Sequence, residues 1–182
     1  MRALVVFESM FGNTRDVARA VADGVSSRLP VETVEVGTTP SVPGDDVVLL
    51  VVGGPTHALG LSRAGTRADA ARQASGPLVS TVVGIREWLD AVDAVDAGSR
   101  RVVAAAFDTR VAKPRLPGSA AKAAVRRLRR LGFPIVAPAA SFFVDGTKGP
   151  LLDGELDRAR AWGAELGAAA VRGSTECSPG RP

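Results

Sequence analysis

The sequence predicts a single α/β domain, a doubly wound sheet of five parallel strands with helices on both faces. Short apolar runs alternate along the chain with segments of helical periodicity, which is the pattern of a parallel sheet buried on both sides. The length of 182 residues, with 46% hydrophobic and 23% charged residues, suits one domain with a substantial core. Ligands of such sheets bind at the carboxyl ends of the strands, so we expect function in the loops after the first, third and fourth strands.

The first strand is predicted at residues 3–7, and a helix follows at 13–28. Valine recurs at every fourth position between residues 17 and 25, which gives this helix one apolar face among charged neighbours. Asn13 is its predicted N-cap, and Asp16 adds a negative charge where the helix dipole favours it.

The remaining elements follow from the same two patterns. Strands bounded by Gly, Pro or Asp are predicted at residues 31–36, 47–52, 102–107 and 133–136, the last one continuing at 141–144. Helices with apolar residues at helical spacing are predicted at 81–95, 119–131 and 155–171. The domain is therefore expected to span residues 1–172, and residues 173–182 are expected to form a disordered tail.

Hydropathy argues against a membrane span and against a secretory signal. The longest apolar runs, such as residues 47–52, have the length of a strand and fall far short of the roughly 20 residues of a membrane helix. Only five apolar residues precede Glu8, whereas a signal-peptide core has about 7–15. We therefore expect a cytoplasmic protein without a transmembrane segment.

The charge pattern and the rare residue types exclude further classes. The net charge is +4 and the pI is near 10.2, but the basic residues are spread along the chain outside one cluster, and there is no Tyr to interleave with them. This composition does not favour a nucleic-acid partner. The lone His57 excludes a multi-histidine metal site within one chain, so no metal is expected. The lone Cys177 lies in the predicted tail and forms no internal disulfide.

The loop after the first predicted strand has the features of an anion-binding loop. Ser9 and Thr14 place hydroxyls at its ends, Gly12 lies between them, and a helix N-terminus follows, so backbone N–H groups and the helix dipole favour phosphate. No Lys follows the glycine, as a nucleotide-hydrolysing P-loop requires, and the three-glycine dinucleotide fingerprint is absent. The residues alone fit either a phosphate loop or an ordinary strand-to-helix turn.

Residues 4–14, together with Gly-Gly-Pro-Thr-His at 53–57, resemble the flavodoxin-like family of FMN-binding proteins. The phosphate loop of that family reads Ser or Thr, any residue, Thr, Gly, any residue, Thr. The matching positions here are Ser9, Gly12 and Thr14. Phe11 stands where the middle Thr would be, which removes one hydroxyl donor and keeps a backbone N–H.

The resemblance covers residues 1–171 and implies the strand order 2-1-3-4-5 and FMN as the cofactor. It places the phosphate on Ser9, Met10, Phe11, Gly12, Asn13 and Thr14. It places one side of the isoalloxazine ring against Pro55, Thr56, His57 and Ala58, and the other against Phe107, Asp108, Thr109 and Arg110. The two ring loops leave strands that flank the first one, so they are expected to converge beside the phosphate loop.

The ring contacts would be unusual for this family. Trp88 and Trp162 lie in predicted helices, where core packing explains them, so the ring would rest on backbone groups, His57 and Phe107. His57 fits a flavin-edge contact or an exposed loop histidine, and Phe107 fits a ring contact or the core. Flavodoxins that strongly stabilise the neutral semiquinone commonly have Gly at the position of Ala58, where a positive φ costs an L-residue roughly 1 kcal/mol or more.

Several charged segments keep two interpretations. Asp108 and Arg110 fit either an ion pair with each other or contacts with the flavin. A run of arginines in the fourth predicted helix fits a solvated face or a docking patch for an acidic redox partner, and it consists of Arg126, Arg127, Arg129 and Arg130. The segment at 146–150 fits a plain turn or a loop from which Lys148 reaches the site, and the segment at 59–77 fits a lid over a second pocket.

The leading functional prediction is a flavodoxin-like FMN protein that carries electrons between cytoplasmic redox partner proteins. One alternative is an FMN-dependent oxidoreductase with its own small-molecule substrate, such as a quinone or a tetrapyrrole precursor, which a second pocket would favour. Another is a flavin-free adaptor domain with the same fold. A response-regulator receiver would need an Asp after the third strand, where this chain has Gly53 and Gly54.

Overall fold

Five strands form one parallel sheet in the order β2-β1-β3-β4-β5, which confirms the predicted fold class and strand order. The computed structural model describes residues 1–39, 44–74, 76, 78–92, 102–114 and 117–175. The strands are β1 (Arg2–Phe7), β2 (Val31–Glu35), β3 (Val47–Pro55), β4 (Val103–Val111) and β5 (Ala140–Val144). The helices are α1 (Asn13–Ser26), α2 (Ala64–Gln73), α3 (Ile85–Ala91), α4 (Ala120–Arg130) and α5 (Glu155–Thr175), with a short 3-10 turn, η1 (Val36–Thr38).

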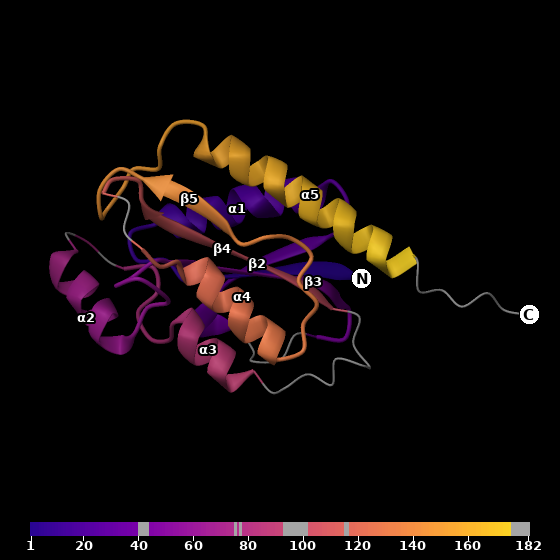
Figure 1. Cartoon of the computed structure of the whole chain (residues 1–182), viewed down its shortest axis with the longest axis horizontal. Coiled ribbons are helices and arrows are strands. Elements are labelled where there is room, and N and C mark those ends of the chain that lie inside the picture. Colours follow the sequence, from indigo (N-terminus) through magenta and orange to yellow (C-terminus); the bar gives the residue numbers. More distant parts are fainter. Residues whose placement is uncertain (40–43, 75, 77, 93–101, 115–116, 176–182) are drawn as a thin grey trace, which may run out of the picture.

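Helices cover both faces of the sheet, with α1 and α5 on one side and α3 and α4 on the other (Figure 1). Alternate side chains of β1 enter the two layers: Val5 packs with α1 and α5, whereas Val6 packs with α3 and α4. Both side chains are fully buried, because a parallel sheet between two helix layers has no solvated face. Among the described residues, no helix is both long enough and apolar enough to cross a membrane.

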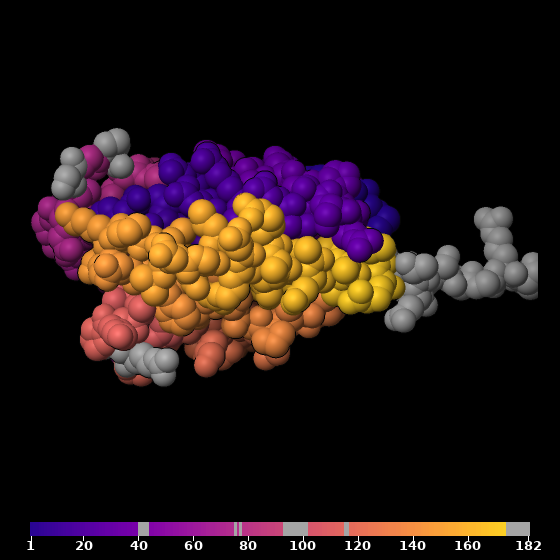
Figure 2. Space-filling view, turned by 90° about the horizontal axis from the view of Figure 1, so that it is seen from above, coloured from indigo at the N-terminus to yellow at the C-terminus, as the bar shows by residue number. Residues whose placement is uncertain are grey.

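Helices α1 and α5 approach each other closely enough to need glycine at the contact. A Cβ on Gly24 would lie 2.0 Å from the carbonyl oxygen of Arg160, and one on Gly163 would lie 2.1 Å from that of Val21. Figure 2 shows α5 lying along α1 over most of its length.

The structure corrects the predicted fifth strand. Residues 133–136 form a single bridge, between Ile135 and Ala104, and the edge strand β5 begins only at Ala140. Pro134 lies within this segment and Pro138 follows it, and proline has no N–H to contribute to a ladder. The apolar run therefore lies beside β4, where the Pro134 carbonyl oxygen and the Val136 N–H both bond to Ala104, without forming a regular strand.

Three helices also differ from the prediction. Helix α2 was not predicted, because only Arg67 and Ala70 are buried along it and no apolar periodicity develops. Helix α3 begins after Gly84, later than predicted, and residues 93–95 of the prediction lie outside the described residues. Helix α5 continues to Thr175 into the predicted tail, and the rest of that tail, residues 176–182, also lies outside the description.

Candidate functional site

A cavity of about 270 Å³ opens at the carboxyl ends of β1, β3 and β4, and we call it the loop cavity. It is lined by most of the predicted site residues: Ser9, Met10, Phe11, Asn13, Thr14, Pro55, Thr56, His57, Ala58, Thr109 and Arg110. The predicted residues Gly12, Phe107 and Asp108 are outside this lining. Pockets that enclose a drug-sized ligand measure roughly 300–1,000 Å³, so a larger ligand here would stay partly exposed.

The loop between β1 and α1 is shaped by Gly12, which is the N-cap of α1 and has a φ of 98°. The prediction of Asn13 as the N-cap is wrong, because Asn13 is already helical and its side-chain amide donates to the carbonyl oxygen of Lys148 at 2.9 Å. A Cβ on Gly149 would lie 2.5 Å from that amide. Asn13 thus fastens the start of α1 to the turn after β5.

Ser9 holds the same loop from inside. Its hydroxyl oxygen accepts from the N–H groups of Gly12 at 3.2 Å and Arg15 at 3.3 Å, and its own N–H donates to the Ser80 hydroxyl at 3.0 Å. The N–H groups of Asn13 and Thr14 belong to the first helical turn, which has no intrahelical acceptor for them. This cavity edge therefore combines unpaired helix donors with the positive end of the helix dipole, which is the chemistry of an anion site.

Thr14 and Thr109 join the start of α1 to the end of β4. Their hydroxyl oxygens lie 2.7 Å apart, and both side chains are buried while still lining the cavity. The pair has two hydroxyl hydrogens and uses one of them between its members. The second hydrogen remains for a ligand in the loop cavity.

A tight turn at residues 57–60 forms one wall of the loop cavity. His57 and Gly60 exchange two backbone hydrogen bonds of 2.9 Å, and Ala58 and Leu59 between them have φ values of 42° and 74°. Positive φ at both central residues is the type I′ geometry that Asn-Gly usually adopts, so this Ala-Leu turn is strained. The opposing backbone at Gly118 leaves no room for a Cβ, which would lie 2.0 Å from the Leu59 carbonyl oxygen.

The environment of His57 favours its neutral form. Burial lowers the pKa of His57 below 6.5, the nearby Arg67 lowers it further, and a hydrogen bond with the Thr66 backbone acts in the opposite direction. The imidazole lines the cavity as an uncharged group at neutral pH. His57 is therefore half-buried at the site and not a solvent-exposed loop histidine.

Phe107 and Asp108 lie behind the cavity. Phe107 packs edge-to-face against Phe142 and Trp162, with ring centroids 5.9 and 6.2 Å away. The Oδ2 atom of Asp108 accepts from the Ser119 hydroxyl at 2.6 Å, the Thr56 hydroxyl at 2.9 Å and the Ala121 N–H at 3.0 Å. Asp108 thus joins the β3 loop to α4 and does not form the ion pair with Arg110, which donates to the Gly118 carbonyl oxygen at 2.6 Å.

A second buried carboxylate, Glu8, was not singled out from the sequence. Its Oε2 accepts from the Ile85 N–H at 2.9 Å, and its Oε1 has no hydrogen-bond partner among the described residues. Burial raises the pKa of Glu8. Beside it, the buried Arg67 donates to the Ser62 hydroxyl and to Glu87 Oε2, both at 3.0 Å. The signal in the sequence was an acid directly after an apolar strand.

Helix α2 supplies the cavity lining that the sequence did not predict. Its cavity-lining residues are Thr66, Asp69, Ala70 and Gln73. The segment predicted as a lid thus does border the site, as a helix beside the strand ends (Figure 1). From the turn after β5 the lining residue is Thr147, whereas Lys148 takes part through its carbonyl oxygen. Val111 and Val144 complete the wall.

Comparison with known proteins identifies the architecture. No protein-family profile and no curated protein matches the sequence. Among solved structures, an archaeal flavodoxin superposes with a TM-score of 0.64 at 18% identity, covering 94% of this chain and 99% of that one. Flavodoxin 1 from Bacillus cereus gives 0.62 at 17% identity, covering 91% and 97%. This chain has the flavodoxin fold.

The same fold also matches one part of a longer solved structure. Rubredoxin:oxygen oxidoreductase from Desulfovibrio gigas superposes with a TM-score of 0.62 at 15% identity, and the match covers 95% of this chain but 37% of that one. Identities this low establish the fold alone. Within the flavodoxin fold, the loop cavity lies where the strand order reverses between β1 and β3, the position at which open α/β sheets bind ligands.

Proposed function

We propose that this chain is a flavodoxin-like protein that binds one FMN in the loop cavity and transfers electrons between cytoplasmic redox partner proteins. The observation that carries the proposal is the meeting of three loops at one cavity, one of them an anion-binding helix N-terminus. FMN would supply the redox chemistry, and the protein would bind and orient it.

The phosphate would bind at residues 9–14. The first-turn N–H groups of α1 and the free hydroxyl hydrogen of the Thr14–Thr109 pair are donors without a protein acceptor in the described contacts. Ser9 fixes the loop shape through its hydroxyl and does not need to touch the phosphate. These donors fit a phosphate group, and Phe11 contributes its backbone N–H in place of the missing threonine hydroxyl.

The isoalloxazine ring would lie between the β3 and β4 loops. Pro55, Thr56, His57 and Ala58 would border one side, and Thr109 and Arg110 the other. We propose that Phe107 and Asp108 support the ring site without touching the ring. Phe107 packs in the core, and Asp108 holds Thr56 against α4. A neutral His57 can donate or accept one hydrogen bond at the ring edge without adding charge.

The experiment is reconstitution with FMN followed by anaerobic reduction. We expect one tightly bound FMN per chain, and we expect the reduced protein to pass electrons to an added acidic one-electron carrier protein faster than free FMN does. A chain that binds no FMN would contradict the proposal and leave the flavin-free adaptor.

A second candidate function, an FMN-dependent oxidoreductase with its own substrate, is favoured by one observation. A second cavity lies next to the loop cavity and shares His57, Ala58 and Thr66 with it. A molecule bound there would lie across the turn at residues 57–60 from the flavin. Steady-state reduction of a small molecule that saturates with its concentration would distinguish this enzyme from a carrier.

A further inference from the structure

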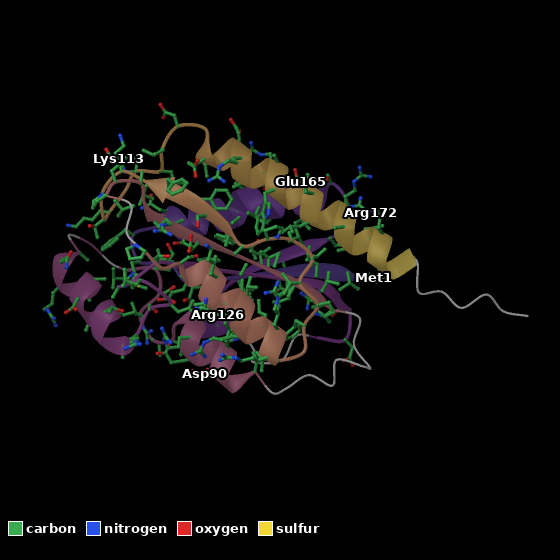
Figure 3. The ribbon with its side chains drawn as sticks, viewed as in Figure 1. Met1, Asp90, Lys113, Arg126, Glu165 and Arg172 are labelled. Atoms are coloured by element: carbon green, nitrogen blue, oxygen red, sulfur yellow. The ribbon has the colours of Figure 1, made fainter. Side chains whose placement is uncertain are left out.

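The second cavity, of about 470 Å³, is lined by five arginines, and we call it the arginine cavity. They are Arg63, Arg86, Arg126, Arg127 and Arg130. They come from the start of α2, from α3 and from α4, and the turn at residues 57–60 closes the side toward the loop cavity. None of the described residues that line it is acidic. Figure 3 labels Arg126 on α4 and Asp90 on the neighbouring α3.

Two of the five guanidinium groups are held in place by the protein. Arg86 donates from Nε to the Ser62 carbonyl oxygen at 2.9 Å and from Nη2 to the Leu61 carbonyl oxygen at 2.7 Å. Arg127 forms an ion pair with Asp90 at the far end of α3. These contacts fix the position of both groups, so a ligand would not have to order them.

The other three arginines form no ion pair with any carboxylate among the residues that the structure describes. In the described part of the chain, no Asp or Glu lies within ion-pair distance of Arg63, Arg126 or Arg130. Burial lowers the pKa of Arg86, the charges of Arg127 and Arg63 lower it further, and the charges of Glu87 and Asp90 act in the opposite direction. The cavity thus gathers five guanidinium groups, and within the described part of the chain a carboxylate forms an ion pair with Arg127 alone among them.

Helix α4 places three of the four arginines in its run at the cavity and the fourth on another face. Arg126, Arg127 and Arg130 line the cavity, because residues three and four apart share a helix face, whereas Arg129 lies outside the lining. Arg126, Arg129 and Arg130 are all exposed, so the difference between them is the face of the helix and not burial. A merely solvated basic face would not bring guanidinium groups from three helices to one hollow. Guanidinium groups pair bidentately with phosphate and carboxylate oxygens, which makes such a hollow suited to a multiply charged anion.

We propose that the arginine cavity binds an anionic small molecule that carries a phosphate or diphosphate group, or paired carboxylates. Binding itself does not depend on FMN. A role for this molecule as the reaction partner of the flavin rests on the proposed function, because His57 and Ala58 border both cavities.

The test is calorimetric titration of the full chain, saturated with FMN, with pyrophosphate and separately with citrate. We expect saturable binding of at least one probe with one site per chain. The tighter probe identifies the ligand class, phosphorylated or polycarboxylic. Saturation with FMN keeps the probe out of the phosphate loop.

A double variant and a matched control locate the site. Arg126→Gln with Arg130→Gln should weaken binding by about tenfold or more, since each removes a charge-assisted contact. Arg129→Gln with Lys122→Gln removes the same two charges from the same helix, at positions outside the lining, and should alter the affinity less than about twofold. Equal losses in both proteins, as expected for a diffuse basic face or an acidic protein partner, would overturn the proposal. Absence of saturable binding by both probes would do the same.

His57 gives a second readout that needs no flavin. It is the chain's single histidine, so its imidazole resonance is assigned without ambiguity. An anion in the arginine cavity should raise the pKa of His57 in the parent and in the matched control, but not in Arg126→Gln with Arg130→Gln. If the chain fails to bind FMN, the His57 pKa is compared in the same proteins with Thr14→Val added, which weakens anion binding at the phosphate loop. That comparison still tests whether the arginine cavity binds the anion.

Discussion

The two cavities share one wall, the turn at residues 57–60, and are built from different materials. The loop cavity uses backbone N–H groups, hydroxyls and strand ends, whereas the arginine cavity uses long side chains on helix surfaces. The loop cavity lies where the sheet reverses its strand order, so any chain with this fold would have one. The arginine cavity depends on individual side chains, so other chains with the same fold can lack it. The predictions below separate the two.

The largest effect is expected at Gly118, which supports the shared turn. Gly118→Ala forces an L-residue to a φ of 85° and places a Cβ 2.0 Å from the Leu59 carbonyl oxygen, so it should destabilise the protein by more than about 2 kcal/mol. Gly146→Ala is the matched control, with a φ of 70° and nothing within 4 Å of the added Cβ. It should lose only about 1 kcal/mol. Urea unfolding measures both, and equal losses would show that the turn does not rest on Gly118.

The next effect concerns the loop cavity alone. Thr14→Val removes the hydroxyl donor at the start of α1, and the Thr109 hydroxyl loses the partner that holds it in place. FMN affinity should fall about 10- to 150-fold, the value of one charge-assisted hydrogen bond of about 1.5–3 kcal/mol. Riboflavin affinity and pyrophosphate binding in the arginine cavity should stay unchanged. A similar loss for riboflavin would mean that Thr14 shapes the ring site instead.

A smaller effect is expected from relieving the strained turn. Leu59 has a φ of 74° and is 53% exposed, so Leu59→Gly should stabilise the protein by up to about 1 kcal/mol. Leu156, an exposed leucine in the first turn of α5, provides the control. Leu156→Gly should destabilise by roughly 0.5–1 kcal/mol. The opposite signs of two leucine-to-glycine changes are the measurement, and equal signs would refute strain in the turn.

The smallest effect is a pH dependence from His57. Its pKa in the folded protein lies below 6.5, so between that lowered pKa and 6.5 the folded state binds fewer protons than the unfolded chain. Stability contributed by His57 is therefore present above about pH 6.5 and is lost as the pH falls through the lowered pKa. Urea unfolding over about pH 5–7.5 should show a slope that His57→Gln reduces. An unchanged slope would contradict the lowered pKa.

The sequence was sufficient to predict the strand order of the sheet. It was not sufficient to predict which residues at the strand ends line the cavity. The continuous apolar runs of β1, β3 and β4 identify buried parallel strands, but they do not show where those strands end. The end of β4 was predicted at Phe107, whereas the strand continues to Val111. Phe107 and Asp108 are therefore covered by α5 and α4, and the lining begins at Thr109.

Helix α2 could not be predicted for a related reason. It packs beside the strand ends and not on the sheet, so little of it is buried and no apolar stripe marks it. Conversely, the apolar run at residues 133–136 satisfies a strand pattern but forms a single bridge with β4, and its Pro134 has no N–H to donate. Hydrophobic periodicity indicates which residues are buried against the sheet. It gives no signal for residues that line the rim of a cavity.

The central claim is that the loop at residues 9–14 holds the phosphate of FMN. Calorimetry of the flavin-free protein with FMN and with riboflavin tests it most directly, because the two ligands share the ring and differ in the phosphate. We predict that FMN binds at least about tenfold more tightly, since the phosphate gains charge-assisted hydrogen bonds that riboflavin lacks. Equal affinities for the two flavins would contradict the assignment.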